Sequence, residues 1–388
     1  MRSVPFAAWI LVSALVACGT PAPALVVDAG ADAGDVDAGA NANLLSLRTV
    51  RDAVSRNAVC NDGTAAIYYV HRSVARSTRW VVYLGGGGFA ANLDEVFQRQ
   101  MYVPELVTST GAPTTMDGAG LLSSRANDNP DFYNDNLVFV RYCSSDVWSG
   151  DREASTETAN FEFRGKAIVR AVLEDLSDSS LTEEPNLASA SELLFAGGSA
   201  GGIGVLSVLD EVAAQLQAVN VRGFCDAGWL TGVASFAPPL LSLAQGMTMG
   251  RPLWNGHADS DCVAAHADDE TACYLGEFAY PHLQTPIFIN ISQLDGALLL
   301  LNHVPAPMDT DSAELIAIRN LYFANFAALT RDSLSLVTAC YSAIDIAHAV
   351  GPSAEFTSRV SLGETTAHVL GNWYFGRPGV THLIQQPE

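Results

Sequence analysis

The sequence predicts an α/β protein in which a mostly parallel sheet is flanked by helices within a single domain. Three observations lead to this prediction. Short apolar runs, typical of buried parallel strands, recur along the chain and end in glycine or polar residues. Segments with helical periodicity lie between these runs. The chain has 388 residues and is 49% hydrophobic, which is enough material for the core of one large domain.

The N-terminal segment is organised like an export signal. Arg2 precedes a short apolar stretch, and Leu-Val-Ala-Cys at 15–18 is similar to the lipobox of bacterial lipoproteins, in which the cysteine becomes the lipidated first residue. We therefore expect a lipoprotein signal peptide at 1–17, lipid on Cys18, and anchoring to the cell envelope, at an outer membrane facing periplasm or exterior. An ordinary signal peptide is the alternative. Residues 18–43 are expected to form an acidic tether and residues 44–388 the folded domain.

Six further cysteines in an exported chain predict disulfide bonds. The spacing does not settle their connectivity, although Cys262 and Cys273 bracket a short acidic loop and are the most natural local pair. Zinc is the alternative, but no C-x2-C spacing supports it, and we expect no metal. The six residues are Cys60, Cys143, Cys225, Cys262, Cys273 and Cys340.

The charge balance excludes several classes of partner. The chain carries 42 Asp and Glu against 20 Lys and Arg, a net charge of −22. Nucleic-acid binding depends on a basic surface, so we expect no nucleic-acid partner. Docking on an anionic membrane by charge is excluded for the same reason. No apolar run after the N-terminus reaches the roughly 18 residues needed to cross a bilayer.

Five apolar runs are expected to form neighbouring strands. Helical patterns lie between and after them, notably at 203–216 and 315–322. In such a sheet, functional residues lie at the carboxyl ends of the strands. The predicted strands are 79–84, 137–140, 193–196, 221–224 and 286–291, and the residues after them include Gly85–Gly88, Gly197, Asp226 and Asp295.

The strongest local motif surrounds Ser199. Residues 197–201 read Gly-Gly-Ser-Ala-Gly, a G-x-S-x-G pattern between a predicted strand and a predicted helix. This is the pattern of the α/β-hydrolase nucleophile, which sits on a sharp turn whose neighbours must be small. We predict that Ser199 is a nucleophile. A purely structural glycine turn is the alternative.

A nucleophilic serine needs a histidine base and a carboxylate that orients the base. In α/β-hydrolases the chain order is Ser, then Asp or Glu, then His. Asp295 follows the best late strand and is our predicted acid, with Asp226 as the alternative. His368 is our predicted base because it lies in a polar segment near the end of the domain. The alternatives are His348, which lies among apolar residues, and His382.

The four glycines Gly85–Gly88 also follow a strand. A phosphate-binding loop is the alternative reading, but Phe89 and Ala90 break the G-x-G-x-x-G spacing, and we expect no cofactor. Hydrolases take one oxyanion N–H from such a loop and another from the residue after the serine. We therefore predict an oxyanion hole built by Gly87, Gly88 and Ala200.

Several segments together resemble the family of pectin acetylesterases and Notum-type carboxylesterases. They extend from CNDGT at Cys60 to AH at His368, and the stretch YCSSDVWSG beginning at Tyr142 is the most specific. The resemblance implies an extracellular serine carboxylesterase whose triad is Ser199, Asp295 and His368. It also implies substrate contacts by Phe89, Asp146, Trp148, Asp226 and Trp229.

The sequence departs from this family at the glycine loop. Members often carry Glu-Gly-Gly-Trp where this chain has Gly85–Gly88, so Gly88 replaces an aromatic residue. Aromatic side chains dominate the energetics of apolar pockets. We therefore expect a short acyl group, and removal of acetyl from acetylated saccharides such as pectin. The alternatives are a Notum-like deacylase of longer acyl chains on lipid or protein, and a hydrolase-fold surface protein that only binds.

Overall fold

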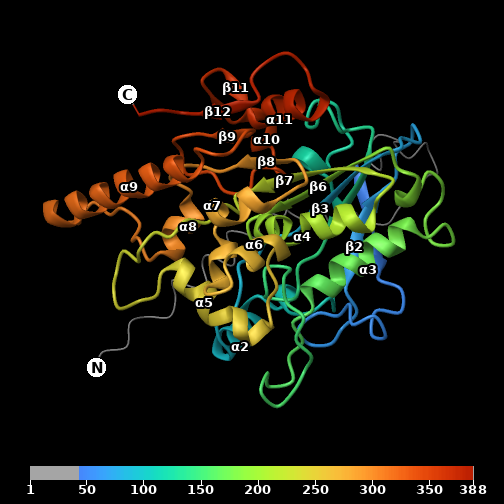
Figure 1. The fold of residues 1–388 in the computed structure, drawn as a ribbon, viewed down its shortest axis with the longest axis horizontal. Helices are drawn as coiled ribbons and strands as arrows, with labels where there is room; N and C mark the ends of the chain where they lie inside the picture. The colour runs from blue at the N-terminus through green and yellow to red at the C-terminus, as the bar shows by residue number, and fades with distance from the viewer. Residues whose placement is uncertain (1–42, 388) are drawn as a thin grey trace, which may run out of the picture.

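The computed structural model describes residues 43–387 and confirms the predicted α/β arrangement (Figure 1). A ten-stranded sheet has the order β12-β9-β8-β7-β6-β3-β5-β2-β1-β4. From β12 to β5 all neighbours are parallel, whereas β2, β1 and β4 continue the sheet antiparallel. The strands are β1 Leu44–Thr49, β2 Ile67–His71, β3 Arg79–Leu84, β4 Thr115–Asp117, β5 Asn136–Val140, β6 Glu192–Gly198, β7 Asn220–Asp226, β8 Ile287–Asn290, β9 Cys340–Ser342 and β12 His382–Ile384, with a separate hairpin of β10 Val360–Ser361 and β11 Glu364–Thr365.

Helices cover both faces of the sheet (Figure 1). The α-helices are α2 Leu93–Tyr102, α3 Gly165–Ser177, α4 Ala200–Gln215, α5 Leu243–Trp254, α6 Ser260–Ala265, α7 Gly276–Ala279, α8 Gly296–Leu301, α9 Ala313–Ser333, α10 Glu355–Ser358 and α11 Thr366–Phe375. Short 3₁₀ helices lie at Pro104–Leu106, Gly120–Leu122, Leu187–Ser189, Glu270–Tyr274 and Tyr280–His282.

The five predicted strands are β3, β5, β6, β7 and β8. Their continuous apolar character follows from burial on both faces. Along β3, Val82 and Leu84 belong to the core cluster that includes α3 and α4, whereas Val81 and Tyr83 belong to the cluster that includes α11. Side chains therefore alternate between two cores, and the carboxyl ends of these strands meet at one edge.

Helix α9 forms where helical spacing predicts it, but with a different buried face. Ile318 and Leu321 are 51% and 73% exposed, whereas Arg319, Phe326 and Thr330 are buried. The helix lies at the side of the molecule (orange, left in Figure 1). Only one of its faces therefore contacts the domain.

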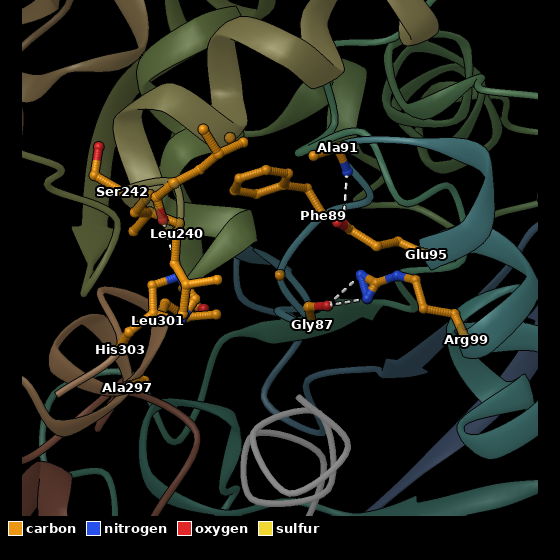
Figure 2. A pocket seen from close by; sticks show the side chains of 15 residues that line it. Gly87, Phe89, Ala91, Glu95, Arg99, Leu240, Ser242, Ala297, Leu301 and His303 are labelled. Atoms are coloured by element: carbon orange, nitrogen blue, oxygen red, sulfur yellow. Dashed lines mark hydrogen bonds between the residues drawn. The ribbon is translucent and has the colours of Figure 1, made fainter. Parts of the chain in front are cut away.

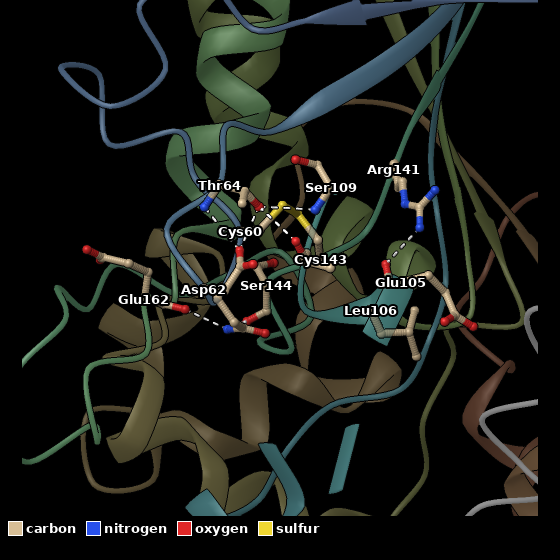
Figure 3. The surroundings of a disulfide bond; sticks show 12 residues. Cys60, Asp62, Thr64, Glu105, Leu106, Ser109, Arg141, Cys143, Ser144 and Glu162 are labelled. Carbon is tan, nitrogen blue, oxygen red and sulfur yellow. Dashed lines mark hydrogen bonds between the residues drawn. A yellow bond between two sulfur atoms is a disulfide. The ribbon is translucent and has the colours of Figure 1, made fainter. Parts of the chain in front are cut away.

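Two disulfides form within residues 43–387. Cys262–Cys273 confirms the predicted local pair, and Cys60–Cys143 joins the segment after β1 to the end of β5 (Figure 3). Cys225 and Cys340 are buried free thiols. Both pair in register with Ile289, on opposite sides of β8. Two strand spacings put them roughly 9–10 Å apart, whereas a disulfide needs Cα atoms within about 7 Å.

The described residues contain no helix that is both long and apolar enough to cross a membrane. The predicted signal peptide, Cys18 and the acidic tether lie outside the residues that the structure describes.

Candidate active site

Ser199 occupies a sharp turn between β6 and α4. Its φ of 55° and ψ of −120° are rare for a residue with a side chain, and such strain is typical of functional sites. The turn requires small neighbours, because a Cβ on Gly197 would lie 2.3 Å from the Gly201 carbonyl oxygen, and one on Gly201 would lie 2.1 Å from that of Leu84. The Ser199 N–H donates to the Asp226 carbonyl oxygen at 2.8 Å, which fixes the turn against β7. The local geometry of a nucleophile elbow is therefore present.

Asp295 lies after β8 and caps α8. Its Oδ1 accepts the N–H groups of Ala297 and Leu298, each at 3.0 Å, and its side chain is fully buried. Both carboxylate oxygens also face His348 Nδ1, at 2.9 and 2.8 Å. A carboxylate in this position keeps the proton on Nδ1 and leaves Nε2 as the basic nitrogen.

The prediction that His368 pairs with Asp295 is wrong. His368 lies in the first turn of α11, its side chain is 59% exposed, and its Nδ1 contacts the Glu364 carboxylate. His382, the other late alternative, is the exposed first residue of β12. His348 instead follows β9, a three-residue strand that our reading of the sequence missed. The prediction placed the base in a loop after a late strand, and β9 was not among the strands that the sequence predicted.

The loop that carries His348 is fixed by Asp226. One oxygen of this buried carboxylate accepts the Gly351 N–H at 2.6 Å and the Tyr83 hydroxyl at 3.1 Å, and the other accepts Asn290 Nδ2 at 2.6 Å. Burial raises the pKa of the Asp226 carboxyl group, although these hydrogen bonds oppose the shift. The prediction that Asp226 contacts substrate is therefore corrected, since its oxygens are occupied in holding the histidine loop.

The second ring nitrogen of His348, Nε2, can act as a proton acceptor. His348 Nε2 is buried and has no hydrogen-bond partner among the described residues. The next residue, Ala349, reaches the turn of Ser199, since a Cβ on Gly198 would lie 3.2 Å from the Ala349 Cβ. Burial alone would lower the pKa of His348, but the Asp295 carboxylate, and with it Asp226, raises this pKa above its usual value. The unpartnered nitrogen is thus a candidate base, in a loop whose next residue lies beside Gly198.

Ser199 is one of the residues that line a cavity of about 240 Å³. Figure 2 shows this cavity from close by. The predicted oxyanion residues Gly87 and Gly88 line it, together with Phe89, whose ring packs edge-on against Trp254 at 5.5 Å. Ala200, the third predicted oxyanion residue, is buried in the first turn of α4. The facing wall is mostly apolar, with Leu240, Leu241, Leu243, Ala297 and Leu301, and it also carries the polar side chains of Ser242 and His303.

Three other predicted substrate contacts are structural instead. Asp146, Trp148 and Trp229 are buried and do not line the cavity. Asp146 accepts the Ser144 hydroxyl at 2.6 Å and the Gly165 N–H at 2.8 Å. Trp148 Nε1 donates to the Gly85 carbonyl at 3.0 Å, and Trp229 Nε1 donates to Ser333 Oγ at 2.8 Å. These three side chains therefore hold neighbouring segments of the fold in place.

The sequence reading missed the leucines of the cavity wall. Leu240 and Leu241 lie in the loop before α5, and Leu301 ends α8. No motif marks these positions. The one available signal was the pair of consecutive leucines in a proline-containing loop, at a place where a soluble surface would favour polar residues.

One group of side chains has the composition of a metal site. Cys262, His266 and His282 place ligand atoms within 4.8 Å of one another. Cys262 is bonded to Cys273 and so offers no thiolate. The two imidazoles that remain do not make a complete zinc ligand set.

Comparison with known proteins gives matches over most of the chain. Residues 38–387 match a family described as pectinacetylesterase. The palmitoleoyl-protein carboxylesterase NOTUM of Homo sapiens is 30% identical over 332 residues, covering 82% of this chain and 64% of the relative. The Drosophila melanogaster protein of the same name is 31% identical over 300 residues, covering 75% and 43%. Notum1a of Danio rerio is 34% identical over 256 residues, covering 63% and 50%. The chain thus spans less than two thirds of the length of these curated relatives.

Proposed function

Because this chain belongs to the pectinacetylesterase family, as the sequence predicted, we propose that it is a serine carboxylesterase with Ser199, His348 and Asp295 as its catalytic triad. One observation carries the proposal: the His348 imidazole is held by Asp295 through Nδ1, its buried Nε2 has no hydrogen-bond partner among the described residues, and the next residue, Ala349, lies beside Gly198 in the turn that bears Ser199. This combination of nucleophile, base and orienting carboxylate is what acyl transfer to serine requires.

The reaction follows from these roles. The Ser199 hydroxyl attacks the ester carbonyl, and His348 Nε2 takes its proton and passes it to the leaving alcohol. A water molecule, deprotonated by the same nitrogen, then hydrolyses the acyl-enzyme. The N–H groups of Gly87, Gly88 and Ala200 would stabilise the oxyanion, each contributing about 3–4 kcal/mol if it behaves like other such donors. The free N–H groups at the start of α4 favour the same negative charge.

The cavity wall favours an acyl group longer than acetyl. Four leucines and Phe89 surround a space that an acetyl group would leave largely unfilled. Each methylene buried there contributes about 0.8 kcal/mol. The volume of about 240 Å³ lies just below the roughly 300–1,000 Å³ of pockets for drug-sized ligands, and so suits one chain of medium length. We therefore propose medium-chain acyl esters, which revises the expectation of acetyl.

The charges around the cavity support a neutral substrate. Arg99 is the only Lys or Arg among the lining residues, and its guanidinium is already bonded to the Gly87 carbonyl. Glu95 adds an acidic group at the same wall. A polyanion such as pectin would find no basic groove at this cavity, and the net charge of −22 would repel it.

Deacetylation of saccharides is the second candidate. It is favoured by Gly88, which leaves open the space where many family members have an aromatic side chain. An acetyl esterase needs little apolar contact on the acyl side, because its specificity comes from the alcohol. The two candidates therefore predict opposite dependence on acyl length.

A panel of p-nitrophenyl esters from acetyl to dodecanoyl tests the proposal. We expect kcat/KM to rise from acetyl to about octanoyl, by up to nearly fourfold for each methylene, and Ser199→Ala to lower kcat/KM by at least about 10³. Leu240→Ala with Leu301→Ala should flatten this rise and leave acetyl hydrolysis unchanged. Leu336→Ala, an exposed leucine that does not line the cavity, is the matched control. A maximum at acetyl, together with hydrolysis of acetylated saccharides, would favour the second candidate.

We also propose that the chain is exported and held at the cell envelope by lipid on Cys18. The two disulfides support an oxidising compartment. Mass spectrometry of the mature N-terminus should find diacylglycerol on Cys18, and Cys18→Ala should release the protein from the membrane fraction. An unmodified mature N-terminus at another residue would refute the anchor.

A further inference from the structure

The peptide unit between Gly87 and Gly88 has unusual conformational freedom. Gly87 has a φ of 150° and Gly88 a φ of 64°, values that L-residues with side chains rarely adopt. Without Cβ atoms, this peptide can turn either its carbonyl or its N–H toward the cavity at similar cost. An oxyanion hole works in only one of these orientations, because a carbonyl oxygen facing the developing negative charge would repel it.

Arg99 of α2 holds the carbonyl in place. Its Nη1 donates to the Gly87 oxygen at 2.6 Å, and its Nη2 contacts the same oxygen. Its Nε donates to Ser145 Oγ at 3.2 Å, which orients the plane of the guanidinium. Figure 2 shows the guanidinium pointing from α2 at the Gly87 carbonyl, beside the cavity. In a trans peptide the C=O and N–H point in opposite directions, so a carbonyl held toward Arg99 directs the Gly88 N–H away from it.

The burial of Arg99 is costly, and the negative charges of nearby Glu95 and Asp146 offset this cost only in part. The residue is 6% exposed, and within residues 43–387 no carboxylate lies at ion-pair distance from its guanidinium. Burial lowers the pKa of this guanidinium, although arginine stays charged in proteins. An apolar side chain of similar size would fill the same space at lower cost. A purely structural role therefore does not account for a cation at this position.

We propose that Arg99 is a positioning residue of the oxyanion hole: it fixes the Gly87–Gly88 peptide so that the Gly88 N–H faces the oxyanion, and its charge polarises that peptide into a stronger donor. This inference rests on the proposed function. Hydrogen bonds in series strengthen one another, and a bond from a charged donor is roughly twice as strong as a neutral one. Arg99 thus acts on the transition state through the Gly88 backbone, without touching the substrate.

The test separates transition-state binding from ground-state binding. Arg99→Met should lower kcat by about 10²–10³, as loss of one oxyanion donor does, with KM changing less than about threefold. Its affinity for a trifluoromethyl ketone, which forms a tetrahedral oxyanion on the serine, should fall by the same factor as kcat/KM. Its affinity for the matching unreactive amide should stay as in the parent. The kcat of Arg99→Lys, which keeps the charge but loses the planar fork, should lie between that of the parent and that of Arg99→Met.

The control is a second buried arginine away from the cavity. Arg164 is buried and pairs with Asp151, Glu153 and Glu162. The substitution Arg164→Met therefore removes a comparable cation and its ion pairs. We expect it to lower the melting temperature and to leave kcat per folded molecule unchanged. If Arg99→Met does not fold, Arg99→Lys carries the same comparison.

Two results would overturn the inference. The first is loss of activity by the Arg99 variants only in proportion to the unfolded fraction. The second is an equal loss of affinity for the ketone and for the amide, which would mean that Arg99 only shapes the cavity. Ser199→Ala keeps the two proposals distinct: if Ser199→Ala is inactive and Arg99→Met has parental kcat, the inference fails and the proposed function stands. If Ser199→Ala retains activity, the proposed function itself fails.

Discussion

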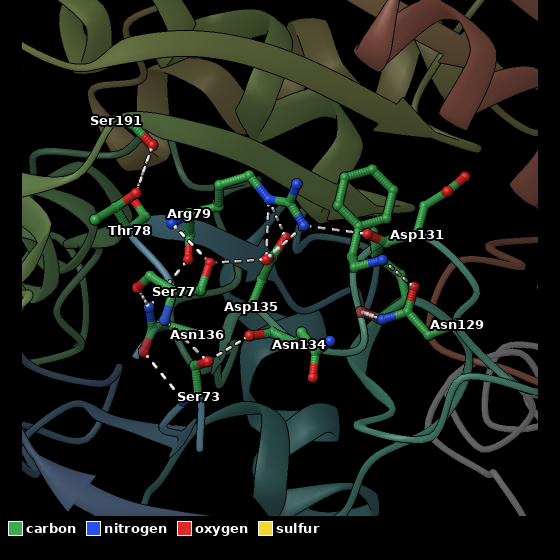
Figure 4. Close-up of polar contacts among 12 residues, drawn as sticks. Ser73, Ser77, Thr78, Arg79, Asn129, Asp131, Asn134, Asp135, Asn136 and Ser191 are labelled. Atoms are coloured by element: carbon green, nitrogen blue, oxygen red, sulfur yellow. Dashed lines mark hydrogen bonds and ion pairs between the residues drawn. The ribbon is translucent and has the colours of Figure 1, made fainter. Parts of the chain in front are cut away.

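The two ends of strands β3, β5 and β6 are both rich in polar residues, yet they differ in how those residues are satisfied. At the amino ends, Arg79 Nε donates to both oxygens of Asp135, at 3.0 and 3.1 Å, and the Ser77 hydroxyl donates to the same carboxylate (Figure 4). Asn136 Nδ2 donates to the carbonyls of Ser77 and Arg79. These polar side chains thus find partners within their own network.

The carboxyl ends are arranged differently. His348 Nε2 is buried without a hydrogen-bond partner among the described residues, Ser199 has a strained backbone, and the buried Arg99 donates to the Gly87 carbonyl and to Ser145 Oγ. A buried polar group without a partner costs about 1–3 kcal/mol, and an unpaired charge costs more. Polar residues at strand ends therefore do not by themselves identify a site. The carboxyl ends differ because a strained serine turn lines a cavity there and a carboxylate holds an imidazole whose other nitrogen has no partner.

Among the substitutions that distinguish the two ends of the strands, Asp295→Asn is expected to have the largest effect on kcat. The amide cannot keep His348 in the tautomer with a free Nε2, so kcat should fall by about 10⁴, as for the equivalent change in a known triad. The circular dichroism spectrum should remain that of the parent. A loss of less than about tenfold would mean that Asp295 is only a helix cap.

The pH dependence of kcat/KM tests how the two carboxylates act on His348. The base must be neutral to accept a proton, so kcat/KM should rise with pH, tenfold per unit below the pKa of His348. Since Asp295 and Asp226 raise this pKa, the midpoint of the acidic limb should lie above about 6.5. Asp226→Asn removes one of the two negative charges and should move the midpoint to lower pH. A midpoint below about 6 in the parent would contradict this account of the site.

The smallest effect on catalysis is expected at the amino ends. Asp135→Ala removes the acceptor of Arg79 and Ser77 and should lower the free energy of unfolding by about 1–3 kcal/mol in urea titrations. The kcat/KM of the folded fraction should match that of the parent, because this network lies at the opposite end of the strands from Ser199. A specific loss of catalysis in a fully folded Asp135→Ala protein would break the distinction between the two ends.

Much of this arrangement could be predicted from the sequence. Short apolar runs identified five central strands, and the glycines around Ser199 identified the elbow because only small residues fit that turn. Asp295 was predicted because it lies in the first loop after the apolar run of β8. In each case a short stretch of sequence was enough for the prediction, because the physical requirement acts on residues that are neighbours in the chain.

The features that the sequence did not predict depend on tertiary packing. Strand β9 has three residues, Cys-Tyr-Ser, and is too short to be recognised by periodicity, so His348 after it was kept only as an alternative to His368. The apolar neighbours of His348 suggested a core segment, whereas the chain turns there with a positive φ at Ala349. Trp148 and Asp146 lie in the most specific motif, and only their burial reveals a supporting role.

The most direct test of this account compares His348→Asn with His368→Asn by steady-state kinetics on the best ester of the acyl panel. We predict that His348→Asn lowers kcat/KM by at least about 10³, whereas His368→Asn, at an exposed surface position, stays within about twofold of the parent. The contrary result, a catalytic loss in His368→Asn with activity retained in His348→Asn, would contradict the assignment of the base and with it the geometry of the site.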